Sequence, residues 1–232
     1  MALPKIATPT YSLIIPSTKK EIKYRPFLVK EEKLLLIAQE SNDTTEILNA
    51  IKQIIENCVF EKISVDELAI YDLEYIFLKL RAKSVGETST VQLPCEHCEG
   101  LNTVTINLDE TEIYEPEIET NIKLNNEIGI ILRPIQVKNI DLVTKEDPGE
   151  NLYGALRAVI SSIYTDEQMY NLDDVVESEI NEFIDSLTHN NLEQINNFVA
   201  NQPAVQTKVN FKCIHCGEEN EVIIRGFQAF FN

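Results

Sequence analysis

The chain has 232 residues, with 38 Asp and Glu against 20 Lys and Arg, so its formal net charge is −18. Binding to duplex nucleic acid depends on a basic face that neutralises phosphates, so this balance argues against nucleic acid as the main ligand. Anionic membrane surfaces are disfavoured for the same reason. Hydrophobic residues make up 44% of the chain, with only 7 Gly and 9 Pro, which excludes a disordered or collagen-like protein.

Nothing in the sequence indicates secretion or a membrane span. No apolar run reaches the roughly 18 to 20 residues that cross a bilayer. The N-terminal segment lacks the basic start, apolar core and small-residue cleavage site of a secretory signal. Five Cys, an odd number, do not resemble a secreted disulfide framework, so we expect a soluble protein in a reducing compartment.

The first part of the chain predicts a short strand pair followed by three helices. Asp43 or Thr44 caps the second helix, and Ser64 with Glu67 has the spacing of a capping box that starts the third. The third helix carries too many apolar residues for one narrow stripe, so we expect it to be the buried one. The strands are expected over residues 8–15 and 21–24, and the helices over 27–40, 44–58 and 64–83.

The rest of the chain predicts two similar hairpins with an acidic, largely helical segment between them. Alternating residues flank Cys95–Cys98 at 88–93 and 101–108, and flank Cys213–Cys216 at 205–211 and 221–224. Between the hairpins we expect a loop or edge segment over 109–120, a strand over 127–133, and helices over 147–165, 173–187 and 191–199.

The acidity is concentrated in this middle part. Residues 99–188 carry 5 basic and 20 acidic side chains, a net charge of −15. A block of this kind is typical of a solvated face that keeps a protein soluble. The functional alternative is docking onto a basic partner surface.

The two Cys-x-x-Cys turns predict a metal site. We call the tight turn of each Cys-x-x-Cys segment a knuckle. The two thiolates of one knuckle can bind one face of a tetrahedral Zn²⁺. A complete set of four sulfur ligands for a structural zinc is therefore supplied by Cys95, Cys98, Cys213 and Cys216. The two pairs are far apart in the sequence, which implies a split zinc ribbon. The free energy of closing the loop between them rises only with the logarithm of its length. Two separate dithiols or disulfides, or a site that holds no metal, are the alternatives.

Other candidate ligands and nucleophiles are weaker. His97 and His215 could replace a thiolate, although the simpler interpretation is that they project outward from the knuckles. Cys58 lies alone on a helical apolar face, which favours a small core residue over a reactive thiol. No phosphate-binding Gly-rich loop, Gly-x-Ser-x-Gly elbow or His-Glu-x-x-His pair is present, so nothing positive indicates an enzyme.

The segment from Tyr24 to Ala38 (YRPFLVKEEKLLLIA), after a short Pro-containing strand entry, resembles the baseplate hub assembly proteins of T4-like contractile-tailed bacteriophages. The chain length, the acidic character and the combination of helices with cysteine-bearing hairpins are also similar to that family. The resemblance is sharpest over residues 4–83. Arg25 to Ala38 is either a shared interaction element or the opening core helix, with the charges of residues 30–33 displayed outward.

The resemblance implies a non-enzymatic protein that helps to build the baseplate hub, as a hub component or as an assembly chaperone. Its partners would be other phage baseplate hub or tail proteins, with no nucleic acid and no membrane. It would act in the cytoplasm of the infected bacterial host or in the tail baseplate of the virion.

Three Phe between Phe227 and Phe231 are expected either to close over the hairpins or to anchor a partner subunit.

We therefore expect an α+β protein, with a helical region over residues 1–86, split zinc-ribbon hairpins over 87–108 and 204–232, and an acidic insertion over 109–203. One rival hypothesis is a zinc-ribbon regulator that contacts polymerase or nucleic acid, which would need Lys and Arg around the knuckles, where this chain has Glu. A metal-dependent or redox enzyme is the other, and it would need an open coordination position or a thiol of low pKa.

Overall fold

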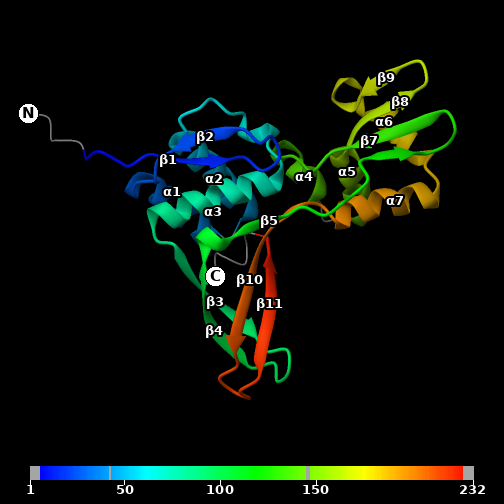
Figure 1. Ribbon diagram of the computed structural model, residues 1–232. Helices are drawn as coiled ribbons and strands as arrows, with labels where there is room; N and C mark the ends of the chain where they lie inside the picture. The colour runs from blue at the N-terminus through cyan, green and yellow to red at the C-terminus, as the bar shows by residue number, and fades with distance from the viewer. Residues whose placement is uncertain (1–5, 42, 145–146, 227–232) are drawn as a thin grey trace, which may run out of the picture. The chain divides into compact units, whose positions relative to one another are not determined.

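Figure 1 shows the computed structural model of the chain, which describes residues 6–41, 43–144 and 147–226. The chain divides into two compact units that combine helices with small antiparallel sheets. We call them the ribbon unit (Met1–Val65, Tyr71–Tyr114 and Ala204–Asn232) and the insert unit (Asp66–Ile70 and Glu115–Pro203). The Phe227–Phe231 segment lies outside the described residues.

The ribbon unit begins as the sequence predicts, with a strand pair and helices. β1 and β2 are antiparallel, and Tyr11 is paired with Tyr24. The side chain of Asp43 caps α2 by accepting a hydrogen bond from the Thr45 N–H at 2.8 Å, which confirms the predicted cap. The elements are β1 (Tyr11–Ile14), β2 (Glu21–Tyr24), α1 (Val29–Ser41), α2 (Thr44–Cys58) and α3 (Ile70–Ser84).

Helix α1 differs from its expected pattern of apolar residues inward and charges outward. Glu31 is only 1% exposed, and its carboxylate accepts hydrogen bonds from the Arg25 guanidinium and the Leu28 N–H, both at 2.9 Å. Leu36 and Ile37, in contrast, are each 55% exposed. A buried ion pair thus takes a place in α1 that periodicity assigns to solvent, because Arg25, six residues earlier, is folded back against it.

Helix α3 is the buried helix, as predicted, but it starts later than the capping box at Ser64 implies. A short 3₁₀ turn, η1 (Val65–Glu67), comes first, and α3 begins at Ile70. The backbone between them pairs with a distant segment: the Val137 N–H donates to the Leu68 carbonyl at 2.9 Å, and the Ile70 N–H donates to the Ile135 carbonyl at 3.0 Å. This non-local pairing competes with helix formation and delays the helix start.

The two predicted hairpins are present in the ribbon unit, and Figure 1 shows them side by side. Their apolar faces pack against Leu78 and Ala82 of α3, in a cluster that includes Val91, Ile106 and Val209. The acidic segment after the first hairpin forms an edge strand on β10, in line with the predicted edge segment. The strands are β3 (Thr88–Pro94), β4 (Leu101–Asn107), β5 (Glu112–Tyr114), β10 (Ala204–Lys212) and β11 (Glu219–Arg225).

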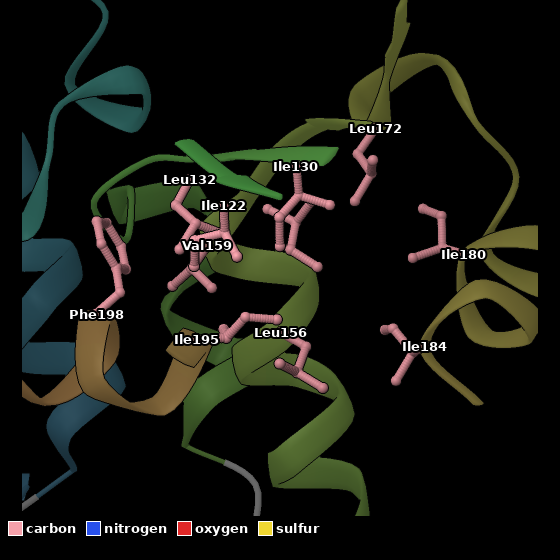
Figure 2. Close-up of a cluster of buried hydrophobic side chains, with 11 residues drawn as sticks. Ile122, Ile130, Leu132, Leu156, Val159, Leu172, Ile180, Ile184, Ile195 and Phe198 are labelled. Atoms are coloured by element: carbon pink, nitrogen blue, oxygen red, sulfur yellow. The ribbon is translucent and has the colours of Figure 1, made fainter. Parts of the chain in front are cut away.

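The insert unit is a four-stranded antiparallel sheet, ordered β6-β7-β8-β9, with helices packed against it. Figure 2 shows its core, in which isoleucine and leucine side chains from strands and helices meet Phe198. The elements are β6 (Asn121–Lys123), β7 (Ile128–Leu132), α4 (Ile140–Val143), α5 (Pro148–Val159), β8 (Ile160–Thr165), β9 (Met169–Asn171), α6 (Glu177–Asp185) and α7 (His189–Ala200), with the 3₁₀ turns η2 (Leu108–Glu110) in the ribbon unit and η3 (Val137–Asn139) and η4 (Leu172–Asp174) in the insert unit.

The expectation of a helix through Thr165 and of a largely helical insertion is wrong. Helix α5 ends at Val159 and the chain continues directly as strand β8, which lies between β7 and β9. The Ile160–Thr165 stretch, ISSIYT, contains β-branched and aromatic residues that suit a strand flanked on both sides. The apolar period of the preceding helix runs into this stretch, so periodicity alone does not separate them.

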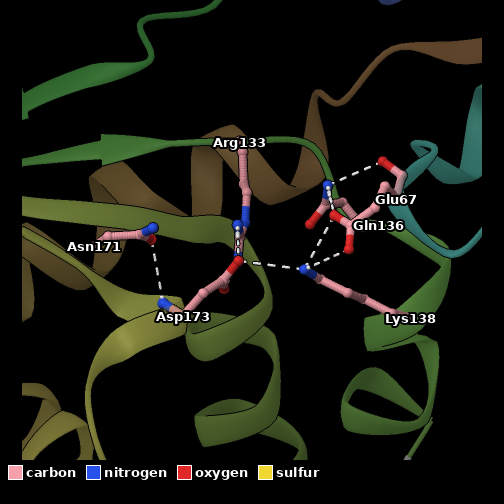
Figure 3. A network of polar contacts seen from close by, with 6 residues as sticks. All are labelled: Glu67, Arg133, Gln136, Lys138, Asn171 and Asp173. Carbon is pink, nitrogen blue, oxygen red and sulfur yellow. Dashed lines mark hydrogen bonds and ion pairs between the residues drawn. The ribbon is translucent and has the colours of Figure 1, made fainter. Parts of the chain in front are cut away.

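A polar network links separate segments of the insert unit (Figure 3). Arg133 binds the Asp173 carboxylate through two guanidinium nitrogens, at 2.6 and 3.1 Å, and Lys138 reaches the same carboxylate at 3.2 Å. Lys138 also pairs with Glu67 at 3.1 Å, next to the hydrogen bond from Gln136 to the Glu67 carbonyl. The network therefore joins residues far apart in the sequence.

The Asp173 contacts predict a pH-dependent contribution to stability. The hydrogen bond from Arg133 lowers the pKa of Asp173 to about 2, against a partial opposing effect of burial. The pKa of Asp173 is lower in the folded state than its value near 4 in the unfolded state, so the ionised carboxylate stabilises the folded state above about pH 4. This contribution is lost as the pH falls through about 2. Asp173→Asn should cost about 1 kcal/mol at pH 7, because the pair is partly exposed, and only a small part of that at pH 2, where about half of the carboxylates are protonated. Urea titrations of both proteins from pH 7 to 2 check this, and a pH-independent difference would contradict it.

Candidate metal centre

Each hairpin turns through a knuckle that places two cysteines at its tip. The Cys95 N–H donates to the Gly100 carbonyl at 3.0 Å, and the Cys213 N–H donates to the Glu218 carbonyl at 2.8 Å. These bonds close the two turns between β3 and β4 and between β10 and β11. In each knuckle the first cysteine is buried and the second is exposed.

The structure brings the four predicted cysteines together. The sulfur atoms of Cys95, Cys98, Cys213 and Cys216 all lie within 4.8 Å of one another. The Sγ atoms of Cys95 and Cys216 are 3.6 Å apart, and those of Cys98 and Cys213 are 3.7 Å apart. Zn–S bonds of about 2.3 Å in a tetrahedron require sulfurs about 3.8 Å apart, whereas a disulfide requires about 2.05 Å. The four thiols are free, and their spacing fits a tetrahedral thiolate-bound metal.

Two buried asparagines lock the knuckles to each other. Asn102, after the first knuckle, accepts a hydrogen bond from the Ile214 N–H of the second at 2.9 Å. Asn220, after the second knuckle, accepts one from the Glu96 N–H of the first, also at 2.9 Å. The side-chain NH₂ of Asn102 also lies 3.6 Å from the Cys213 sulfur. The two hydrogen bonds are reciprocal, because the asparagine that follows each knuckle accepts a backbone N–H of the other knuckle.

Sequence reasoning missed these asparagines, although a signal for them exists. Both knuckles read Cys-x-His-Cys-x-x-x-Asn, as CEHCEGLN from Cys95 and CIHCGEEN from Cys213. The repeat therefore extends beyond the cysteines and includes the residue that braces the opposite turn.

The local hydrogen bonds favour thiolates at the buried positions. Burial acts to raise the pKa of Cys213, but N–H groups of Cys216 and His215 and the amide of Asn102 outweigh it and lower that pKa to about 6. For Cys216, an N–H from Glu218 acts to lower the pKa, but the partial loss of water around the sulfur and the neighbouring sulfurs raise it to about 12. Four thiolates at this spacing repel one another, and a bound cation would remove that repulsion.

Comparison with known proteins identifies the family. A family model described as T4 bacteriophage base plate protein matches residues 8–232. The chain belongs to this family. It is also 25% identical over 221 residues to "Baseplate hub assembly protein gp26" of Enterobacteria phage T4, which covers 95% of this chain and 97% of that protein. No solved structure matches the chain. The resemblance noted in the sequence is thus confirmed.

The knuckles are surrounded by acidic side chains. Five exposed carboxylates lie on or beside the two turns, at Glu96, Glu99, Glu218, Glu219 and Glu221. A phosphate backbone would be repelled by such a surface. In the part of the chain that the structure describes, no helix is long and apolar enough to cross a membrane.

The remaining candidate residues lie outside the sulfur cluster. His97 and His215 are exposed, as predicted, and Nε2 of His215 is 3.1 Å from the Leu101 carbonyl oxygen. Cys58 is 1% exposed in the helical core, and burial raises the pKa of its thiol to about 11. The interpretation of Cys58 as a core residue is therefore confirmed.

The residue after the second cysteine of each knuckle has a left-handed backbone, with φ of 58° at Glu99 and 80° at Gly217. Glycine adopts this conformation freely, whereas other residues lose roughly 1 kcal/mol or more. We expect Gly217→Ala to lower the free energy of unfolding by about 1 kcal/mol, and Glu99→Gly to leave it unchanged or raise it by up to about 1 kcal/mol. Chemical denaturation of the two variants checks the sign, and a loss of stability in Glu99→Gly comparable to that in Gly217→Ala would contradict the strain argument.

Proposed function

We propose that this protein acts without catalysis in assembling the baseplate hub of a contractile phage tail, through protein–protein contacts, either as a hub component or as an assembly chaperone. The family match over residues 8–232 carries this proposal, and the similarity to a protein described as a baseplate hub assembly protein supports it. The site of action is the cytoplasm of the infected host and, for a component, the tail baseplate of the virion. Its partners are other baseplate hub or tail proteins.

A phage from which this gene is deleted tests the proposal. Infected cells should accumulate tails without complete hubs, and tagged full-length protein supplied in trans should restore them and co-purify with hub proteins. Mass spectrometry of purified virions separates the two roles, since a component is present at fixed copy number and a chaperone is absent. Normal hub assembly in the deletion phage would overturn the proposal.

The metal centre has a structural role in this proposal. Cys95, Cys98, Cys213 and Cys216 hold one zinc ion, which supplies a fixed tetrahedral cross-link between the two hairpins and leaves no position for a reactive water. Residues 87–108 and 204–232 then act as halves of a split zinc ribbon, residues 1–86 as a helical region, and residues 109–203 as an acidic insertion. The sulfur spacing and the N–H donors described above support this assignment.

The hydrogen bonds of Asn102 and Asn220 across the two knuckles predict an effect on metal affinity. Asn102→Ala and Asn220→Ala should each weaken zinc binding about 10- to 100-fold, the range found when groups that orient metal ligands are removed. Asn210→Ala, on the exposed face of the same ribbon, is the matched control and should leave the affinity unchanged. Competition with a chromophoric chelator measures all three. Equal affinities in the four proteins would show that these hydrogen bonds do not support the ligands.

Charge indicates the kind of partner surface that the insert unit would meet. Its segments contain 19 acidic and 5 basic residues, a net charge of −14 out of the total of −18. Association through this unit would need a basic partner surface and would weaken with salt. Binding that is insensitive to salt between 50 and 500 mM would exclude this unit as the electrostatic contact.

A further inference from the structure

A small apolar hollow opens between α1 and α3 in the ribbon unit. Its volume is about 140 Å³, close to the roughly 150 Å³ of an apolar cavity that holds benzene. It therefore has room for one side chain of the size of leucine or phenylalanine. We call it the Arg81 groove; its lining includes Phe27, Glu32, Leu35, Leu36, Arg81 and Val85.

The rim of the groove is apolar and exposed. Leu36 is 55% exposed and Val85 is 63% exposed, while Phe27 and Leu35 beneath them are buried. The Phe27 N–H donates to the Ser84 hydroxyl at 2.9 Å, so the start of the α1 segment is fixed to the end of α3. An exposed apolar rim around a formed hollow is typical of a contact surface.

The lining of the groove includes a cation, Arg81. Nη1 of Arg81 is buried and has no hydrogen-bond partner among the described residues. Glu32 lines the same hollow but does not supply that partner, and burial lowers the pKa of Arg81. In contrast, Arg25, Arg133 and Arg157 each pair with a carboxylate. The Arg81 guanidinium forms no ion pair with a described residue, and a carboxylate is the group that best binds a guanidinium.

We propose that the Arg81 groove docks a segment of a partner protein that presents one leucine- or phenylalanine-sized side chain next to a carboxylate. The apolar walls take the side chain, and the Arg81 guanidinium binds the carboxylate. The proposal rests on the proposed assembly function, because it assigns one of the protein contacts through which that function operates.

A pair of small probes tests the chemistry directly. The anion 3-phenylpropanoate has the phenyl ring and carboxylate that the groove should accept, and 3-phenylpropanamide has the same shape without the charge. Titrated into the isotope-labelled full chain, the anion should shift the NMR signals of Leu36 and Val85 and bind at least tenfold more tightly than the amide. Arg81→Gln should remove this tenfold difference. Equal binding of the two probes to the unaltered protein, or no shift at the groove, would overturn the proposal.

Complementation of the deletion phage tests the function of the groove. Arg81→Gln and Leu36→Asp should each lower the yield of complete hubs at least tenfold, while Met169→Asp, at a 62% exposed apolar position in the insert unit, should not. Thermal melts of the variants check folding, and Arg81→Gln removes no hydrogen bond of Nη1 because this atom has no partner among the described residues.

The two proposals fail in different ways. If the deletion phage assembles hubs normally, the assembly function is wrong. If the deletion phage lacks complete hubs and both groove variants restore them fully, the groove proposal is wrong while the assembly function stands. If Leu36→Asp converts an oligomer of the purified chain into a smaller species by sedimentation, the occupant is a second copy of this chain, which also overturns the proposal.

Discussion

Purified protein is expected to contain one zinc ion per chain, and removing that ion should cost most of the stability of the ribbon unit. Structural zinc sites contribute about 10–16 kcal/mol of apparent binding free energy, whereas a whole domain is stable by only about 5–15 kcal/mol. The tips of the hairpins depend on the metal most, because the apolar cluster against α3 involves the strands and not the knuckles. Replacing Cys95, Cys98, Cys213 and Cys216 by serine should therefore abolish zinc binding and lower the melting temperature by roughly 20 °C or more.

The matched control is the fifth cysteine. Cys58→Ala removes a sulfur from the helical core and should retain one zinc per chain, because Cys58 lies outside the sulfur cluster. Elemental analysis gives the stoichiometry, and melts with and without a strong chelator give the stability. A four-serine variant as stable as the unaltered protein, together with less than about a tenth of an equivalent of zinc in the latter, would refute the metal assignment.

The hairpins and their cysteines could be predicted from the sequence because short sequence patterns indicate both. Period-two alternation marks β3, β4, β10 and β11, and each Cys-x-x-Cys turn marks a tip. That the two tips meet is a non-local fact, which only the repetition of the device indicated. The spacing of Asn102 and Asn220 repeats as well, but an asparagine near a turn also occurs for local reasons, so its bond across to the other knuckle was not predicted.

The errors arose where tertiary contacts override local propensity. The start of α3 is delayed because residues 68–70 pair with residues 135–137, and Glu31 is buried because Arg25 neutralises it. The stretch 160–165 is a strand because it has strand neighbours on both sides. The partners of residues 68–70, and strand β7 beside β8, lie outside the window over which periodicity is read. Arg25 lies inside that window, but an ion pair leaves no trace in the apolar period.

A close backbone contact in the insert unit predicts a large effect from a small substitution. Gly154, in α5, faces the backbone of α4, and a Cβ there would lie 1.8 Å from the Leu142 carbonyl oxygen and 2.7 Å from its carbon. No side-chain rotation relieves such a contact, so α4 and α5 would have to separate. Since α5 contributes Leu156 and Val159 to the core of the unit, that separation would also loosen the core. Gly154→Ala should therefore destabilise the unit by about 3 kcal/mol, even though alanine favours helix by about 1 kcal/mol.

Gly149, in the first turn of the same helix, provides the control. A Cβ at Gly149 would meet only the Asp147 side chain, at 3.2 Å, and a small shift of this helix cap relieves the contact. Gly149→Ala should therefore change the free energy of unfolding by less than about 1 kcal/mol, because the helix propensity of alanine offsets the loss at the cap. Urea denaturation of the two variants, followed by circular dichroism of the full chain, should thus give a much larger effect for Gly154→Ala than for Gly149→Ala. Equal tolerance of alanine at both positions would show that α4 does not pack on α5 through Gly154. A loss confined to Gly154→Ala would establish that contact and show that the backbone, and not the helix propensity of the residue, decides stability at this position.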